Sequence, residues 1–326
     1  MRKIIIDTDP GIDDSFAITA ASMYPDFNIL GITTVAGNKG LDITTANALK
    51  MVKLNDIDCF VYKGSSESLM KQKVVKFSGD GPHGADGLGG VKLEYDESKL
   101  STIHAVDFIL ESVKNNPNEV EIIALGPVTN IALAIQKDRE TMKKVKAIYS
   151  MGGGVVAGNV NPVSEFNYWF DALAVAEMYG LGLDVPIHMI GLNVTRPSFF
   201  SANDILFMKL AGGELGNLLY DMQMNVLPDT GWAHGKMIGN VIHDLLAMIY
   251  AIDHTVCPKV INTSLEVSLH GFTVGQTIVD TVMAKSHGPK NAHVAITVDS
   301  RKYKETFMEI VFGKEAKELF KKYVVS

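Results

Sequence analysis

The chain has 326 residues, of which 47% are hydrophobic and 21% charged, proportions that suit a globular protein with a large buried core. Its 30 basic and 37 acidic residues give a net charge of -7. This balance argues against nucleic acid or an anionic membrane as the main partner, and it says nothing against small neutral ligands.

Near-continuous apolar runs of strand length alternate with amphipathic segments of helical length. The predicted strands are 3–6, 28–34, 58–62, 120–125, 146–151 and 186–191. The predicted helices between them are 14–24, 41–54, 102–115, 129–136 and 171–179. Strands that are apolar throughout are covered on both faces, so the alternation predicts an α/β fold with an open, mostly parallel sheet and helices on both sides.

The last part of the chain changes character. Residues 265–300 contain short strand patterns, and helical segments follow at 303–311 and 314–323. No linker-like stretch and no internal repeat interrupts the sequence. We therefore expect a single domain over residues 1–326, in which the strands and helices from about residue 262 form a small α+β extension packed on the main sheet.

The cysteines and the N-terminus bear on the cellular compartment. Cys59 and Cys257 belong to no CxxC motif or Cys/His cluster, which predicts two buried thiols in a reducing compartment. The sequence passes from Met1-Arg2-Lys3 directly into a strand, without a signal-peptide pattern, and contains no apolar run of membrane-spanning length. These features predict a cytoplasmic protein.

The segment "DTDPGIDD" places four carboxylates, Asp7, Asp9, Asp13 and Asp14, at the end of the first predicted strand. In open α/β sheets the ligand binds beyond the carboxyl ends of the strands. Capping of the following helix explains one aspartate. A divalent cation explains all four, because it cancels their repulsion and prefers oxygen ligands; the absence of nearby cysteine favours Ca²⁺ or Mg²⁺ over Zn²⁺.

Two later segments contain further candidates. In "NVIHDLLA", His243 precedes Asp244, and a capped core helix explains this pair as well as a functional site does. In "SEFNYWF", Glu165 and Asn167 flank an aromatic residue, so on an extended segment both side chains would point to one side. Taken alone, an ordinary surface alternation explains the second segment better.

The opening "DTDPGIDD" resembles the fingerprint of the nucleoside hydrolases, the inosine-uridine-preferring family. The resemblance covers nearly the whole chain and continues in the family's order through "ITTVAGN", "HGADGLGG", "ALGPVTN", "MGGG", "GNVNPVSEFN", "IGLNVT" and "HDLLA". It implies the Rossmann-like fold of that family, one bound Ca²⁺ and cleavage of the N-glycosidic bond of ribonucleosides to ribose and a free base. It also implies a role in purine or pyrimidine salvage and a homo-oligomer, either a tetramer or a dimer.

The same resemblance assigns the metal ligands. It implies that Ca²⁺ is held by Asp9, Asp14, the backbone carbonyl of Leu125 and Asp244. Asp9 would also take a proton from the attacking water, and Asn38 could support Asp9, the water or a ribose hydroxyl. Asp7 would support these ligands without itself contacting the metal.

The resemblance further implies which residues contact the substrate. Asp13, Asn159, Glu165 and Asn167 would bind the ribose, whose developing positive charge carboxylates stabilise. His243 would protonate the leaving base, since an ordinary histidine pKa of about 6.5 suits that task, and His83 is the second candidate at the base end.

Some features leave substrate and activity open. Asn193 and Arg196 stand where the family has Asp and His, and Trp232 could stack on the base or lie on the surface. With only two tryptophans and with His243 present, the chain resembles the pyrimidine-preferring or non-specific branch more than the purine-specific one. A Mg²⁺-dependent haloacid-dehalogenase-type phosphatase is disfavoured by Gly11, and a nucleoside-binding protein without turnover by Asp9, Asp14 and His243.

Overall fold

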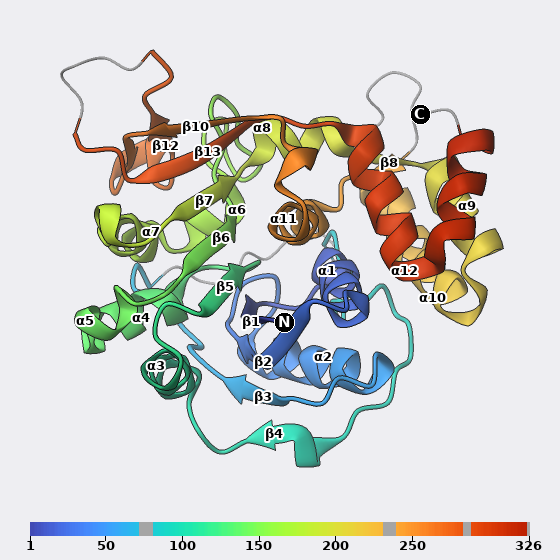
Figure 1. Ribbon diagram of the computed structural model, residues 1–326, viewed down its shortest axis with the longest axis horizontal. Helices are drawn as coiled ribbons and strands as arrows, with labels where there is room; N and C mark the ends of the chain where they lie inside the picture. The colour runs from blue at the N-terminus through green and yellow to red at the C-terminus, as the bar shows by residue number, and fades with distance from the viewer. Residues whose placement is uncertain (72–80, 231–238, 283–287, 325–326) are drawn as a thin grey trace.

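A nine-stranded sheet forms the centre of the computed structural model, which describes residues 1–71, 81–230, 239–282 and 288–324 (Figure 1). Its strand order is β10-β13-β7-β6-β5-β1-β2-β3-β4, and every neighbouring pair is parallel except β10 with β13. The strands are β1 (Arg2–Thr8), β2 (Phe27–Thr34), β3 (Phe60–Lys63), β4 (Leu100–Ser101), β5 (Val120–Ala124), β6 (Ala147–Met151), β7 (Ile187–Ile190), β10 (Lys259–Thr263) and β13 (Ala292–Thr297).

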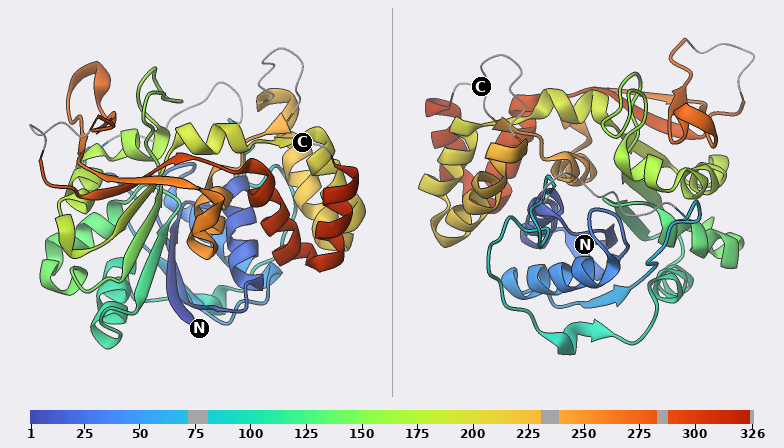
Figure 2. Two further views of the ribbon diagram at one scale, coloured as in Figure 1. Left: turned by 45° about the horizontal axis from the view of Figure 1, so that its top comes forward. Right: turned by 180° about the vertical axis from the view of Figure 1, so that it is seen from behind.

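Helices cover both faces of this sheet (Figure 2). One face carries α1 (Ile12–Met23), α2 (Leu41–Leu54), α11 (His243–Ile252) and α12 (Ser300–Tyr323), which share an apolar core with Ile4 and Ile6 of β1. The other face carries α3 (Ala105–Asn115), α4 (Thr129–Lys137) and α7 (Ala172–Tyr179), which share a second core with Ile5. Successive side chains of a strand point to opposite faces, so three consecutive isoleucines supply both cores.

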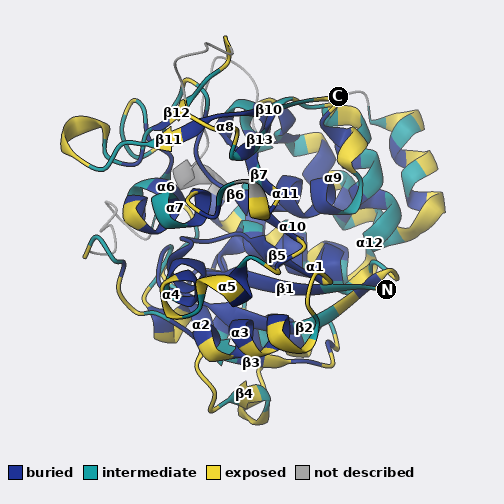
Figure 3. Ribbon diagram, turned by 60° about the vertical axis from the view of Figure 1, so that its left-hand side comes forward, coloured by how far each residue is buried: buried dark blue, intermediate teal, exposed yellow. Residues whose placement is uncertain are grey.

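The remaining elements are short or peripheral. The other helices are α5 (Arg139–Met142), α6 (Phe166–Phe170), α8 (Leu192–Thr195), α9 (Ala202–Ala211) and α10 (Gly213–Thr230). Two antiparallel strand pairs lie outside the large sheet in the described residues: β8 (Phe200–Ser201) with β9 (Gly239–Asn240), and β11 (Leu265–Val267) with β12 (Thr277–Val279). Exposed residues gather on β4 and on the outer sides of the helices, whereas the central strands are buried (Figure 3).

The predicted elements are confirmed. All six predicted strands and all five predicted helices of the main sheet are present, with ends that shift by at most three residues. The two predicted C-terminal helices form α12, which is interrupted by non-helical geometry at Gly313 (φ 89°). The C-terminal strands differ from the expectation: β13 continues the main sheet beside β7 rather than only packing against it, and β10, which was not predicted, pairs with β13 at the sheet edge.

The strand order reverses direction at the middle of the sheet. From β1 the chain moves outward through β2, β3 and β4, then returns to pair β5 with the other side of β1. This reversal is the switch point at which open parallel sheets bind ligands, beyond the carboxyl ends of the two central strands. Asp7 is paired with Thr33 of β2 and Ala124 of β5, so the three strands end side by side at this edge.

No helix in the described ranges is both long and apolar enough to span a lipid bilayer.

Candidate active site

The aspartate loop, residues 9–14, joins β1 to α1 and starts the helix with its own carboxylates. Asp14 accepts a hydrogen bond from the Gly11 backbone N–H at 2.8 Å, and the hydroxyl of Thr8 donates to its other oxygen. A carboxylate in the first turn is favoured because it faces the positive end of the helix dipole. Asp14 is therefore the aspartate that caps this helix, and the hydrogen bonds of the cap fix its position.

Three carboxylates meet at this edge. Oxygen atoms of Asp13, Asp14 and Asp244 all lie within 4.8 Å of one another. Asp244 is in the first turn of α11, which packs directly on α1, so two helix starts contribute to one cluster. The sequence prediction joined Asp9, rather than Asp13, to Asp14 and Asp244. The carboxylate of Asp9 lies beside the cluster, since it interacts electrostatically with Asp14 and Asp244.

Backbone groups of neighbouring loops closely surround the carboxylate of Asp9. Its Oδ2 accepts a hydrogen bond from the Asn38 backbone N–H at 2.6 Å, and the Asn38 amide donates to the Asp9 carbonyl at 3.3 Å. A Cβ added at Gly37 or Gly126 would lie 2.1 Å or 2.4 Å from its carboxylate oxygens. Its Oδ1 has no hydrogen-bond partner among the described residues. One buried oxygen of Asp9 is therefore free for a ligand.

The electrostatics of the cluster favour binding of a positive charge. Burial raises the pKa of Asp9 and of Asp244 well above the usual range, and repulsion from neighbouring aspartates adds to it. The pKa of Asp14 is raised by the same two causes, and burial raises that of Asp13 to about 6. In the described part of the chain, Asp9, Asp14 and Asp244 form no ion pair with lysine or arginine. A cation that is not a side chain would relieve this repulsion, and hard oxygen ligands suit Ca²⁺ or Mg²⁺.

Asn167 connects the cluster edge to β5 and β6. Its amide donates to the carbonyl of Leu125 at 2.7 Å and to that of Met151 at 3.2 Å. The Leu125 carbonyl is the predicted backbone ligand of the metal. Because a carbonyl oxygen has two lone pairs, this hydrogen bond orients the group and leaves one acceptor position.

Glu165 differs from the expected geometry. The segment with Asn167 is not extended: Glu165 is the N-cap of α6, and Asn167 lies in its first turn. The two carboxylate oxygens accept backbone N–H groups of Asn167 at 2.9 Å, Gly153 at 3.0 Å and Tyr168 at 3.1 Å. Burial raises the pKa of Glu165 to about 7, although these bonds oppose the rise. In this arrangement Glu165 holds the loop that positions Asn167.

Both candidate histidines lie at the site and are held as neutral rings. His83 Nδ1 accepts the backbone N–H of Ile12 at 3.1 Å, and burial lowers its pKa to about 4. His243 is the first residue of α11, with Nδ1 2.8 Å from the hydroxyl of Thr195. Burial, and then the charge of Arg196, lower its pKa to about 3. The expected ordinary pKa of about 6.5 for His243 is therefore wrong in this environment.

The other residues named from the sequence lie in different environments. Asn159 is exposed on the loop after β6, where its backbone bonds to Ser164. Asp7 is buried and accepts hydrogen bonds from Thr33 at 2.6 Å and Asn130 at 2.8 Å, which suits its expected supporting position. Asn193 donates to the carbonyl of Ala295 in β13. Trp232 lies outside the described residues.

The sequence alone did not predict the hydroxyl and amide groups that hydrogen bond to the candidate site residues. Thr8, Thr195 and Asn130 each hydrogen bond a predicted site residue. All three lie inside or directly beside the quoted motifs "DTDPGIDD", "IGLNVT" and "ALGPVTN", so their position in those motifs was the available signal.

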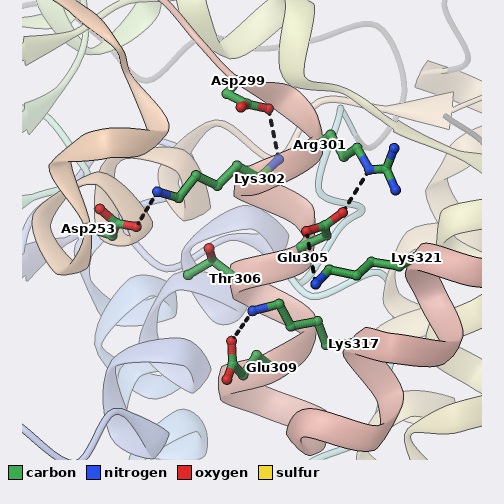
Figure 4. A pocket seen from close by; sticks show the side chains of 9 residues that line it. All are labelled: Asp253, Asp299, Arg301, Lys302, Glu305, Thr306, Glu309, Lys317 and Lys321. Carbon is green, nitrogen blue, oxygen red and sulfur yellow. Dashed lines mark hydrogen bonds and ion pairs between the residues drawn. The ribbon is translucent and has the colours of Figure 1, made fainter.

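A hollow on the surface of the protein lies away from this site. It has a volume of about 730 Å³ and lies along α12, lined by alternating acids and bases (Figure 4). Its cations already have partners: Arg301 pairs with Glu305 at 2.8 Å, Lys302 with Asp253 at 3.1 Å, and Lys317 with Glu309. Exposed pairs of this kind neutralise one another and leave little net charge for a ligand.

The fold and the site define a class of protein: an open α/β sheet with a cluster of buried carboxylates at its switch point. The sequence model of the family described as inosine-uridine preferring nucleoside hydrolase matches residues 4–305. The chain belongs to this family of ribonucleoside hydrolases. Nearly all of the described structure lies within the matched range.

Individual relatives agree with the family assignment. The chain is 34% identical over 305 residues to the pyrimidine-specific ribonucleoside hydrolase RihB of Escherichia coli strain K12, covering 92% of this chain and 93% of that one. Among solved structures it resembles a purine-preferring ribonucleoside hydrolase from Gardnerella vaginalis, with 30% identity, a TM-score of 0.86, and coverage of 97% and 100%. It also resembles the plant nucleoside hydrolase PpNRh1, with 29% identity, a TM-score of 0.88, and coverage of 96% and 99%.

Proposed function

We propose that this protein hydrolyses the N-glycosidic bond of ribonucleosides with the help of one Ca²⁺, giving ribose and a free base. The observation that carries the proposal is the meeting of Asp13, Asp14 and Asp244 within 4.8 Å at the sheet switch point, without a lysine or arginine partner among the described residues. Family membership supplies the reaction class, the oxygen-only donor set suits Ca²⁺ or Mg²⁺, and the family resemblance favours Ca²⁺ of the two.

The carboxylates of Asp9, Asp14 and Asp244 and the carbonyl of Leu125 would hold the ion. All are oxygen donors at one edge, and the free Oδ1 of Asp9 together with the oriented Leu125 carbonyl supports this set. Bound there, the ion would lower the pKa of a water molecule and orient it beside the ribose. Asp13 joins the cluster from the outer side and is left to bind ribose hydroxyls.

Asp9 would act as the general base. Its Oδ2 is fixed by the backbone N–H of Asn38, which leaves Oδ1 to accept the proton of the attacking water. Its raised pKa, caused mainly by burial, favours proton acceptance, whereas a cation nearby moves that pKa back toward the usual range. The backbone of Asn38 thus orients the base.

The sugar would be held by Asp13, Asn159 and Asn167. The bond to the base breaks with positive charge growing on the ribose, so carboxylates nearby stabilise the transition state more than the neutral substrate. The hydrogen bonds of Glu165 to three backbone N–H groups support a positioning role for this residue, with Asn167 as the group that it positions.

The leaving base would receive a hydrogen bond from a neutral imidazole. Since His83 Nδ1 accepts the Ile12 N–H, its proton resides on Nε2, from which it can donate. His243 precedes Asp244 at the start of α11 and forms a hydrogen bond with Thr195. A neutral imidazole donor stabilises negative charge developing on the base without being a cation in the free enzyme.

Pyrimidine nucleosides are the proposed first substrates. Supporting this choice are the pyrimidine-specific bacterial relative at 34% identity and the presence of His243. The similarity to a purine-preferring hydrolase makes inosine the second candidate. We further propose a single-domain cytoplasmic homo-oligomer, as the composition and the family resemblance indicate.

The decisive experiment is an assay of released reducing sugar. Uridine, cytidine, inosine and a generic phosphomonoester are each incubated with the protein after treatment with a chelator, and again after Ca²⁺ or Mg²⁺ is restored. We expect ribose from at least one nucleoside, loss of activity with chelator and recovery with Ca²⁺. Absence of ribose from every nucleoside in the presence of Ca²⁺, or release of phosphate alone, would refute the proposal.

A further inference from the structure

A buried amide on α2 connects the aspartate loop to the loop that carries His83. Asn47 is fully buried, and its Nδ2 donates to the carbonyl of Pro10 at 3.1 Å and to the carbonyl of Asp86 at 2.9 Å. Pro10 belongs to the aspartate loop, and Asp86 to the histidine loop, residues 83–90. We propose that Asn47 is a positioning residue that fixes the place of His83 relative to the aspartate cluster.

The orientation of the Asn47 amide is set by a cation. Lys50 Nζ donates to Asn47 Oδ1 at 3.0 Å, and an ammonium group can only donate. The oxygen of the amide therefore faces Lys50, and both N–H groups face the two loop carbonyls. Each carbonyl thus receives one hydrogen of the same NH₂ group, so the separation of the two loops depends on this group.

Hydrogen bonds between residues of the histidine loop hold it together, so we expect it to move as a unit. The Gly89 N–H donates to the His83 carbonyl at 2.9 Å. The side chain of Asp86 accepts the backbone N–H groups of Leu88 at 2.9 Å and Gly90 at 3.0 Å. A loop with these internal bonds transmits a displacement at Asp86 to His83 instead of absorbing it.

The contacts between the two loops leave little free space. A Cβ added at Gly87, whose φ is +83°, would lie 2.8 Å from Asn47 Nδ2. A Cβ at Gly11 would lie 2.7 Å from Nδ1 of His83, the atom that accepts the Ile12 N–H. The ring of His83 therefore rests directly on the start of α1, and Asn47 holds the other end of the same loop against α2.

This inference rests on the proposed function, because it concerns the histidine proposed to face the base. A displacement of about 1 Å in a positioned group can lower a rate by about 10²-fold. Loss of Asn47 would move His83, while Asp9, Asn38 and Asp14 keep their own hydrogen bonds. The defect should therefore appear mainly at the leaving base.

The test compares two substrates in Asn47→Leu, which has similar volume but no donor. For uridine, kcat/KM should fall by about 10- to 10²-fold, mainly through kcat. For a nitrophenyl riboside, whose leaving group departs without protonation, the change should stay within about threefold. The control is Asn225→Ala, which removes a hydrogen bond from an exposed side chain to the Gly89 carbonyl and should have a smaller effect on both substrates.

Two further measurements keep the test decisive. Gly87→Ala presses on Asn47 from the loop side and should reproduce the same substrate pattern if Asn47→Leu fails to fold. Amide exchange in residues 83–90 should be faster in Asn47→Leu than in the wild type, a result that does not depend on activity.

Equal losses on both substrates, or unchanged exchange in the histidine loop, would overturn the positioning role. If the wild type releases no ribose from any nucleoside, the proposed function fails, and the exchange measurement alone decides whether Asn47 holds the loop.

Discussion

A buried carboxylate lies near each end of β1, and the two differ in whether basic side chains neutralise them. At the amino end, Glu121 of β5 is 1% exposed and is bound by Arg2 Nε at 3.0 Å and Lys146 Nζ at 2.9 Å. These partners hold its pKa below the usual range against the effect of burial. At the carboxyl end, Asp9 is equally buried but has no such partner among the described residues, and its pKa is raised.

The difference separates stability from function. The chain itself neutralises the charge at the amino end, so this end is complete when the protein has folded. At the carboxyl end the described side chains leave Asp9 without a basic partner, and the proposed cation would supply that positive charge. Substitutions at the carboxyl end should therefore affect turnover most, and substitutions at the amino end should affect the free energy of unfolding.

The largest effect is expected for Asp9→Ala. Without the general base and one metal ligand, kcat/KM for the best nucleoside should fall by at least about 10³-fold, whereas the fold is retained. Steady-state assays in saturating Ca²⁺, with circular dichroism, test this. Asp26→Ala, at an exposed aspartate, is the control. A rate near that of the wild type would remove Asp9 as the base.

His243→Ala should affect only the departure of the base. Loss of a donor held beside Thr195 should lower kcat/KM for uridine by about 10²-fold, and barely change that for a nitrophenyl riboside. Parallel assays of the two substrates measure this. Similar losses on both would show that His243 does not assist the leaving group.

Arg2→Met should produce the largest loss of stability at the amino end. It leaves Glu121 buried with only the more exposed Lys146, so the free energy of unfolding should fall by about 3 kcal/mol. Urea denaturation gives this value, and kcat at saturating substrate should be unchanged. If turnover falls while stability is retained, the proposed division between the two ends is incorrect.

Glu165→Gln should change how stability depends on pH. Burial raises the folded pKa of Glu165 from 4.5 to about 7. A carboxyl with a raised folded pKa keeps its proton after the unfolded chain has released it, so its contribution to stability falls as the pH rises through that window. The variant cannot titrate, and relative to the wild type it should gain about 2 kcal/mol between pH 5 and pH 8.

Urea denaturation of the metal-free protein at several pH values checks this gain. Glu119→Gln, at an exposed glutamate, is the control and should give the same difference at every pH. A constant difference between Glu165→Gln and the wild type would show that Glu165 is ionised throughout the range.

Lys146→Ala should have the smallest effect. This lysine is about half exposed, and Arg2 remains bound to Glu121 after its removal. Partly exposed ion pairs contribute little, so the loss should be about 0.5 kcal/mol. Thermal denaturation beside Arg2→Met measures the contrast, and equal losses from both substitutions would contradict the ranking of the two cations.

The sequence predicted the sheet well because its signal is local. Uninterrupted apolar runs mark strands that are buried on both faces, and Ile4, Ile5 and Ile6 are such a run. The placement of β13 beside β7 was not predictable in this way, since it depends on packing between segments far apart in the chain.

The acidic cluster was predictable for a different reason. Crowded aspartates after a strand require an explanation that no local structure provides, and the structure brings Asp244 to them. The histidine pKa values and the capping role of Glu165 were not predictable, because both depend on burial and on distant backbone groups such as Gly153.

The strand order also determines when the site can exist during synthesis. β1 has only β2 and β5 as neighbours, and Asp244 is made only after roughly three quarters of the chain. A nascent chain therefore exposes crowded aspartates long before the residues that complete the site have been translated. Because contacts between distant segments form late in folding, ion binding should report on completed assembly of the sheet rather than guide its early steps.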